Sequence, residues 1–193
     1  MLFFSAMPFA AARLRESLPV AALHLFASAL LAAVLAALIF RIWYRPPYDA
    51  LAGGRLLFVL LVGVDVVCGP LLTLLLFTRS KTRGQLLTDA IMIVALQAAA
   101  LAYGVSTAWN SRPVFLVAEV DRFKVIAWEE IRHADFSSLP PELQPSLWKP
   151  PAIVALRPPA SIEEKNKVLF ESLQTGRDYA ERPEFYIPYS AET

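Results

Sequence analysis

Three stretches of the sequence are each long and apolar enough to cross a lipid bilayer as a helix. Residues 18–40 carry no formal charge, residues 56–77 carry only Asp65, and residues 86–109 carry only Asp89. An α-helix of about 20 apolar residues spans a hydrocarbon core of ~30 Å. The sequence therefore predicts a membrane protein with three transmembrane α-helices, at about residues 18–42, 56–77 and 86–109, followed by a small α+β extramembrane domain.

The composition agrees with this prediction, because 56% of the residues are hydrophobic and a soluble domain of this length rarely carries so much apolar material. The first stretch could also be a cleaved signal peptide, since Arg13 and Arg15 precede it and residues 27–29 resemble a cleavage site. Its apolar part continues to Phe40, however, beyond the about 7–15 residues of a signal's hydrophobic region. An uncleaved anchor is the better interpretation.

Lys and Arg in the short connections predict the orientation of the three spans. One side of the membrane would receive five basic residues, namely Arg13, Arg15, Arg79, Lys81 and Arg83, and the other side three, namely Arg41, Arg45 and Arg55. The side with more basic residues is the cytoplasmic one. We therefore expect residues 1–17 in the cytoplasm, residues 18–111 in the membrane domain, and residues 112–193 in the periplasm, in a bacterial inner membrane.

Residues 112–193 differ in character from the rest, with 10 basic and 13 acidic residues. This net charge of −3 excludes both a nucleic-acid-binding and an anionic-lipid-binding tail, because either would need a basic face. Residues 114–120 and 122–131 flank a turn at Asp121 and predict two strands, and residues 152–156 predict a third. Ser161 and Glu164 form a capping box that predicts a helix ending near Gly176.

Residues that could carry out catalysis or bind a metal are sparse. The single Cys68 and the two histidines, His24 and His133, have no metal-ligand spacing. The sequence contains no Gly-rich phosphate loop. We therefore expect no cofactor, no metal and no small-molecule substrate.

Polar residues inside the predicted spans are the best candidates for function. Counted along the helices, Asp65 and Gln97 lie at one depth near the middle of the membrane, and Asp89 and His24 at another depth nearer the cytoplasm. A charged Asp at mid-membrane costs about 2.5–3.5 kcal/mol on insertion scales, so it usually turns inward. Asp65 could hydrogen-bond to Gln97 and hold helices together, contact a partner helix, or take part in a proton or ion relay.

Gly69 and Pro70 lie one turn beyond Asp65 and predict a kink in the second span. Pro70 has no N–H to donate to the carbonyl of Val66, and Gly69 allows close approach of another backbone. We hypothesise that the kinked helix, the small residue and the acid form a docking groove. In the preceding connection, the aromatic residues Trp43, Tyr44 and Tyr48 predict an anchoring belt at headgroup depth.

The stretches "WYRPPYDALAGGRLLFVLLVGVDVVCGPLLTLLLF", "TDAIMIVALQAAALAYG" and "RPVFLVAEVDRF" together resemble the TfpX/TfpZ-type family of type IV pilin accessory proteins over about residues 40–131. The resemblance implies a non-enzymatic bacterial inner-membrane factor that binds a major or minor type IV pilin and supports its stability or assembly. The residues that carry it are also the candidate partner-binding residues: Tyr44, Asp65, Gly69, Pro70, Asp89, Gln97, Arg112, Asp121 and Arg122.

Two other classes of protein remain open on the sequence. An immunity protein that neutralises a toxin in the envelope would have the same general organisation. A membrane transporter or enzyme using Asp65 would need polar residues at the mouth of a span, and three spans cannot supply a symmetric pair of inverted repeats.

Overall fold

The computed structural model describes residues 7–78 and 80–190, without the side chains of residues 7–13, 55, 57, 60, 61 and 64. Arg79, and the side chains of Arg13 and Arg55, which enter the orientation argument, are therefore outside the described part. The chain forms two compact units: residues 1–37 with 56–107, and residues 38–55 with 108–193. We call them the helical unit and the sheet unit.

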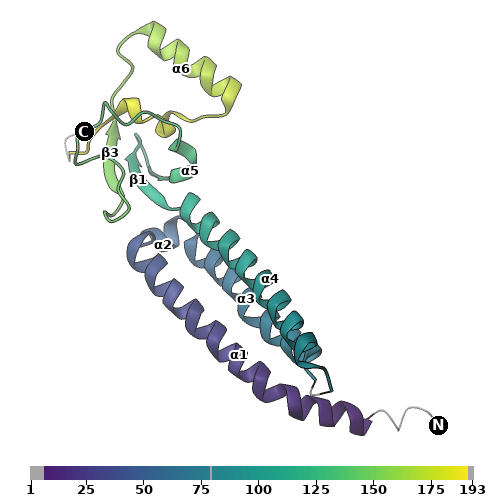
Figure 1. Ribbon diagram of the computed structural model, residues 1–193. Helices are drawn as coiled ribbons and strands as arrows, with labels where there is room; N and C mark the ends of the chain where they lie inside the picture. Colours follow the sequence, from purple (N-terminus) through teal and green to yellow (C-terminus); the bar gives the residue numbers. More distant parts are fainter. Residues whose placement is uncertain (1–6, 79, 191–193) are drawn as a thin grey trace. The chain divides into compact units, whose positions relative to one another are not determined.

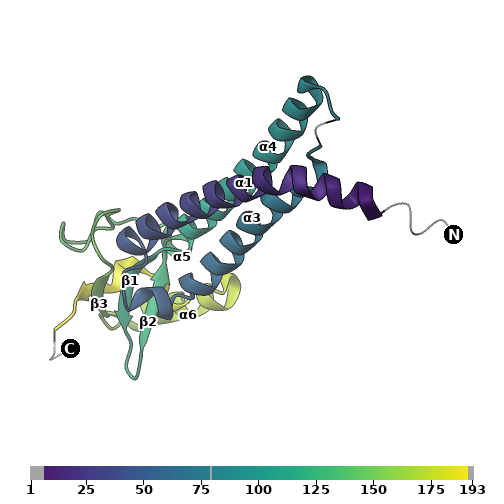
Figure 2. The ribbon, with the colours of Figure 1, turned by 90° about the horizontal axis from the view of Figure 1, so that it is seen from below.

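The helical unit is built from three long helices (Figure 1). They are α1 (Met7–Ile42), α3 (Gly54–Leu76) and α4 (Arg83–Asn110). Residues 77, 78 and 80–82 lie between α3 and α4 (Figure 2). Among them, Lys81 donates a hydrogen bond of 2.8 Å to the carbonyl of Leu76. This bond satisfies one of the carbonyls that the end of a helix leaves without a partner.

The prediction of three membrane spans is wrong. Among the described residues, two helices are long and apolar enough to cross a membrane: Leu14–Ile42 and Arg83–Asn110. In α3 the corresponding apolar stretch is Asp65–Leu76, which at about 1.5 Å per residue reaches only ~18 Å. The predicted span over 56–77 also includes residues whose side chains are outside the described part.

In the described residues, four strands form one sheet in the order β2-β1-β3-β4. Strands β1 (Pro113–Ala118) and β2 (Phe123–Ala127) are the predicted antiparallel hairpin. β3 (Ala152–Leu156) is the predicted third strand and runs parallel to β1. β4 (Tyr186–Pro188), which pairs antiparallel with β3, was not predicted. Its three residues are too few for an alternating pattern to be recognised.

The second predicted strand is too long. Its last residues form the short helix α5 (Trp128–Ile131), because the Glu130 carboxylate accepts a hydrogen bond from the backbone N–H of Ala127 and caps the turn. The core of the sheet unit consists of side chains from the strands, α5 and the following loop. The fully buried members include Phe115, Val117, Ile126 and Val154.

The predicted helix is α6 (Ile162–Thr175), and both of its predicted ends are confirmed. The Ser161 side chain accepts a hydrogen bond from the backbone N–H of Glu164. Gly176 ends the helix with φ of 71°, in the left-handed region that favours glycine. Two 3₁₀ turns, η1 (Tyr179–Glu181) and η2 (Pro183–Phe185), lead from α6 to β4.

The connection after α1 belongs to the sheet unit, which was not predicted. It contains a cis peptide bond between Pro46 and Pro47 and the short helix α2 (Tyr48–Leu51). Tyr44 is 1% exposed, so this aromatic side chain is part of the unit's interior.

Candidate functional site: a polar cluster and a groove in the helical unit

His24 of α1 is hydrogen-bonded to both of the other long helices. Its Nδ1 lies 2.6 Å from Oγ1 of Thr73 in α3, and its Nε2 lies 2.8 Å from Oε1 of Gln97 in α4. An amide oxygen can only accept, so Nε2 of His24 carries the hydrogen. In the neutral ring Nδ1 then accepts a hydrogen bond from the Thr73 hydroxyl, so both ring nitrogens of His24 have a partner.

Gln97 continues this chain of hydrogen bonds to the backbone of α3. Its Nε2 donates to the carbonyl oxygen of Asp65 over 3.2 Å. A Cβ on Gly69 would lie 2.0 Å from the same Nε2, closer than any side-chain atom can approach. Gly69 is therefore required for the Gln97 side chain to lie against α3. The sequence predicted the close approach of another backbone at Gly69, whereas in the structure a side chain lies against it.

The predicted pairing of polar groups by depth is correct only in part. Asp65 and Gln97 do meet, although through the Asp65 carbonyl and not its carboxylate. Asp89 forms an ion pair with Lys81 over 2.6 Å, so it is not the partner of His24. Thr73 was missed, although it follows Gly69 by one helical turn and therefore lies on the same face.

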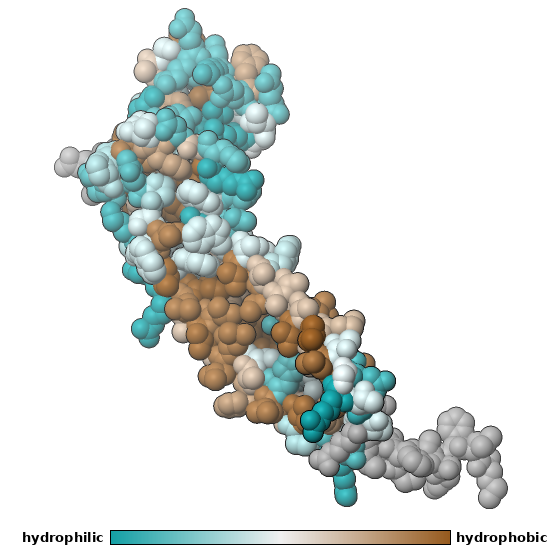
Figure 3. All heavy atoms as spheres, in the orientation of Figure 1, coloured by the Kyte–Doolittle hydropathy of each residue, from teal (hydrophilic) through white to brown (hydrophobic). Residues whose placement is uncertain are grey.

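A groove of about 570 Å³ runs between α1, α3 and α4 next to this polar cluster. It is lined mainly by apolar side chains, and His24, Thr73 and Asp89 contribute its polar surface. The lining residues are Val20, Leu23, His24, Ala27, Thr73, Leu76, Phe77, Leu86, Leu87, Asp89, Ala90, Ile93 and Val94. Apolar side chains gather over the surface of the long helices (Figure 3). The groove therefore offers an apolar surface with a few polar groups at fixed positions.

Tyr44 and Arg112, two of the predicted partner-binding residues, lie inside the sheet unit. The Tyr44 hydroxyl donates a 3.1 Å hydrogen bond to the carbonyl of Ala108. Burial raises the pKa of Tyr44 to about 12, although the nearby Arg112 charge opposes this shift. The hydroxyl thus stays protonated and remains a donor. A Cβ on Gly54 would lie 2.3 Å from the Tyr44 ring, which explains the glycine at that position.

The Arg112 guanidinium lies between two indole rings, 3.8 Å from the centre of Trp109 and 4.5 Å from the centre of Trp128. It also donates a 2.7 Å hydrogen bond to the carbonyl of Trp109. Burial lowers the pKa of Arg112 to about 10, while Tyr44 acts in the opposite direction. Cation–π contacts of this kind stabilise a desolvated guanidinium. Arg112 therefore fixes the junction between α4 and β1.

Asp121 and Arg122 lie at the tip of the β1–β2 hairpin, and both are exposed. The Arg122 Nε donates to the carboxylate of Glu119. A cavity of about 870 Å³ lies beside the tip, between the hairpin and the residues that follow β3. These two residues belong to the sheet unit, whereas the polar cluster belongs to the helical unit. Among the residues that the structure describes, no three His, Cys, Asp or Glu side chains gather as a metal site requires.

Comparisons with known proteins assign the chain to a family. The family described as fimbrial assembly protein FimB matches residues 12–53. A fimbrial assembly protein of serogroup I from Dichelobacter nodosus is 33% identical over 90% of this chain and 67% of the relative. One of serogroups C1 and C2 from the same organism is 37% identical over 58% of this chain and 86% of the relative.

No solved structure matches the chain. The relatives nevertheless cover most of its length, and they confirm the resemblance to type IV pilus accessory proteins. The chain therefore belongs to the family of fimbrial assembly proteins, and its role lies in the assembly of pili.

Proposed function

We propose that the chain is a membrane-anchored accessory factor that binds a type IV pilin subunit and supports its stability or assembly. The relatives are named as fimbrial assembly proteins, which supports a pilus component as the partner. The observation that carries the proposal is the groove of the helical unit. It exposes apolar side chains along a path between helices, as a site for another apolar helix requires.

The polar cluster suits this role. Helices in a membrane associate through close packing and hydrogen bonds, because lipid tails are as apolar as the helices themselves. His24 and Thr73 are held by each other at the edge of the groove. Asp89 is 27% exposed in its ion pair with Lys81. A partner helix with a polar group at that level would find a fixed hydrogen-bonding surface.

We place the chain in the inner membrane with its N-terminal end in the cytoplasm. Arg13 and Arg15 lie in α1 before its uncharged stretch of residues 18–40, which supports this orientation. Residues 38–55 follow from α1 and belong to the sheet unit. We propose that α1 crosses the membrane once, so that the sheet unit lies in the periplasm. We also propose that the chain is not an enzyme, since the polar side chains of His24, Thr73 and Gln97 are engaged in contacts between helices.

Photocrosslinking in living cells tests the groove as the pilin site. A photoreactive amino acid would replace Leu87, which lines the groove and is exposed, or Met92, which is exposed on the same helix outside the groove. We expect a pilin adduct from position 87 at several-fold higher yield than from position 92. Immunoblotting for the chain shows whether both variants accumulate equally. Equal yields from the two positions, or no adduct from position 87 in piliated cells, would contradict the proposal.

A further inference from the structure

Residues 146–149 form an exposed loop with an unusual composition. Ser146, Leu147, Trp148 and Lys149 are all exposed, and the Trp148 side chain is exposed to 70%. Tryptophan is a large apolar residue that is highly buried on average. An exposed Leu-Trp pair followed by a Lys therefore needs a surface that accepts both apolar and charged groups.

Arg45 fixes the position of this loop next to the end of α1. Its Nε donates a 2.8 Å hydrogen bond to the carbonyl of Arg41, in the last turn of α1. Its Nη2 donates a 3.2 Å hydrogen bond to the carbonyl of Trp148. One guanidinium thus connects the last turn of the helix to the loop, and its planar, forked shape suits two acceptors at fixed positions.

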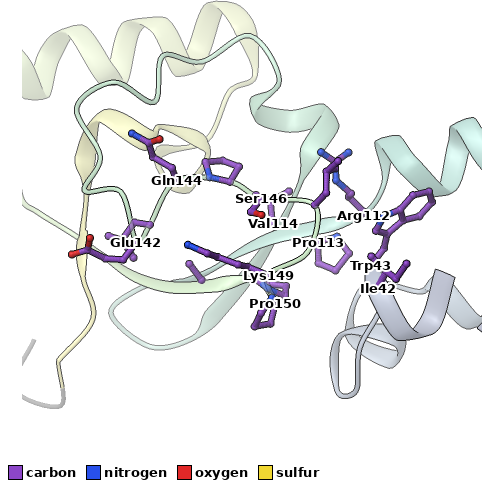
Figure 4. A pocket seen from close by; sticks show the side chains of 15 residues that line it. Ile42, Trp43, Arg112, Pro113, Val114, Glu142, Gln144, Ser146, Lys149 and Pro150 are labelled. Carbon is purple, nitrogen blue, oxygen red and sulfur yellow. The ribbon is translucent and has the colours of Figure 1, made fainter. Parts of the chain in front are cut away.

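A second set of contacts leads to the same placement. A small pocket of about 30 Å³ lies between the end of α1 and the loop. Ile42 and Trp43 line it on the helix side, and Ser146, Leu147 and Lys149 line it on the loop side. Figure 4 shows Ile42 and Trp43 together with Ser146, Lys149 and Pro150 around this pocket. The loop therefore lies at the level where α1 ends.

We infer that the 146–149 loop contacts the lipid headgroups of the membrane that α1 crosses. The candidate span ends at Ile42, and the residues beyond the end of a span lie at the headgroup level. Trp settles at this level because one end of its ring system is apolar and the other is polar. Arg41 and Lys149 are exposed there, and long basic side chains keep their charge in water while their stems lie on apolar surface.

The net charge of −3 for residues 112–193 argued against a lipid-binding tail. The local charge around the loop differs from this overall net charge. Three basic residues from two distant parts of the sequence lie there, namely Arg41, Arg45 and Lys149. The partner is therefore a bilayer surface. The loop binds it by inserting Trp148, and the basic side chains around Trp148 contact the headgroups. This inference extends beyond pilin binding and requires only that α1 is inserted in the membrane.

Spin labelling of the full chain tests the contact. In a Cys68→Ser background, a nitroxide would be placed by Trp148→Cys, or by Val120→Cys at the fully exposed hairpin tip. The chain would be reconstituted in nanodiscs of phosphatidylethanolamine and phosphatidylglycerol. Oxygen dissolves in lipid, whereas a nickel chelate stays in water. We expect the ratio of oxygen to nickel collision rates to be several-fold higher at position 148 than at position 120.

A label at Leu30, exposed on α1, reports whether this helix is in the bilayer. If Leu30 is accessible to oxygen and position 148 resembles position 120, the loop contact is overturned while the anchor stands. If Leu30 is also in water, both the contact and the membrane anchor are overturned. A label at 148 shielded from both probes would mean a protein contact and would also overturn the inference.

Arg45→Lys keeps the positive charge but removes the forked guanidinium that binds both carbonyls. It should lower the ratio of oxygen to nickel collision rates at position 148, and an unchanged ratio would overturn the role of Arg45.

Discussion

His24, Thr73 and Gln97 satisfy one another's hydrogen-bonding groups across three helices. In a membrane such bonds contribute about 0.6–2 kcal/mol each, less than the cost of leaving the same groups without partners. The cluster depends on Gly69, because the amide of Gln97 occupies the space where any other side chain would begin. A residue without a side chain thus determines how three polar side chains meet.

We predict that Gly69→Ala destabilises the helical unit. The new Cβ would displace the Gln97 side chain and break its hydrogen bond to the Asp65 carbonyl. Overpacking of this kind lowers the free energy of unfolding by about 1–3 kcal/mol. The free energy of unfolding in detergent measures this change. Gly63→Ala is the matched control, since a Cβ there meets nothing within 4 Å. Gly69→Ala combined with Gln97→Ala should recover part of the loss, and equal effects of Gly63→Ala and Gly69→Ala would refute the role of Gly69.

At the scale of elements, α6 is attached to the rest of the sheet unit by charged side chains. Its apolar residues lie on the surface, with Ile162 exposed to 78% and Leu173 to 74%. Ion pairs connect the helix to the rest of the sheet unit instead. Arg157 binds Glu164 through two hydrogen bonds of 3.0 and 3.1 Å, and Arg182 binds Glu171 over 2.6 Å. The attachment of α6 is therefore electrostatic.

We predict that acid releases α6 before it unfolds the sheet. Hydrogen bonds from Arg157 and Arg182 lower the pKa of Glu164 and of Glu171. A lowered pKa means stabilisation that is present above the ordinary value of about 4.3 and is lost as the pH falls through the folded value. Hydrogen exchange, corrected for its intrinsic pH dependence, should show α6 losing protection between about pH 5 and pH 3. Phe115 and Val154 in the core are the internal control, and protection of α6 that stays constant over this range would contradict the prediction.

The sequence predicted elements whose causes are local. The apolar length of α1 and α4, the Ser161 cap and Gly176 all act within a few residues of themselves. Other features depend on residues distant in sequence. Periodicity places Leu169 and Leu173 on one face of α6 but does not tell what covers that face. Depth along the helices predicts that His24 lies level with Asp89, but the Asp89 carboxylate forms an ion pair with Lys81 instead.

At the scale of the molecule, the two units are interleaved along the chain. Residues 38–55, which include the end of α1, belong to one unit with residues 108–193, and the bond from Tyr44 to Ala108 connects these two segments. Both segments must therefore lie on the same side of any membrane that α1 crosses.

We predict that Ala50→Cys and Val120→Cys, both at exposed positions, react equally with a membrane-impermeant maleimide in cells with a permeable outer membrane. The background would be Cys68→Ser, which leaves no other thiol. A tag added before Met1 should stay protected from protease in the same cells. Labelling at only one of the two positions would show that the connection and the tail are on opposite sides, and it would exclude the interleaved arrangement.

The bond between Tyr44 and Ala108 also determines when the protein can finish folding. The two residues are 64 positions apart, and a ribosome adding roughly 5–20 residues per second needs about 3–13 s to cover that distance. During this time the segment around Tyr44 has been synthesised, but Ala108, whose carbonyl accepts the hydrogen bond from the Tyr44 hydroxyl, has not. The sheet unit is therefore completed late in synthesis. A shortened gene that begins at residue 112 would encode the strands without the segment that packs against them.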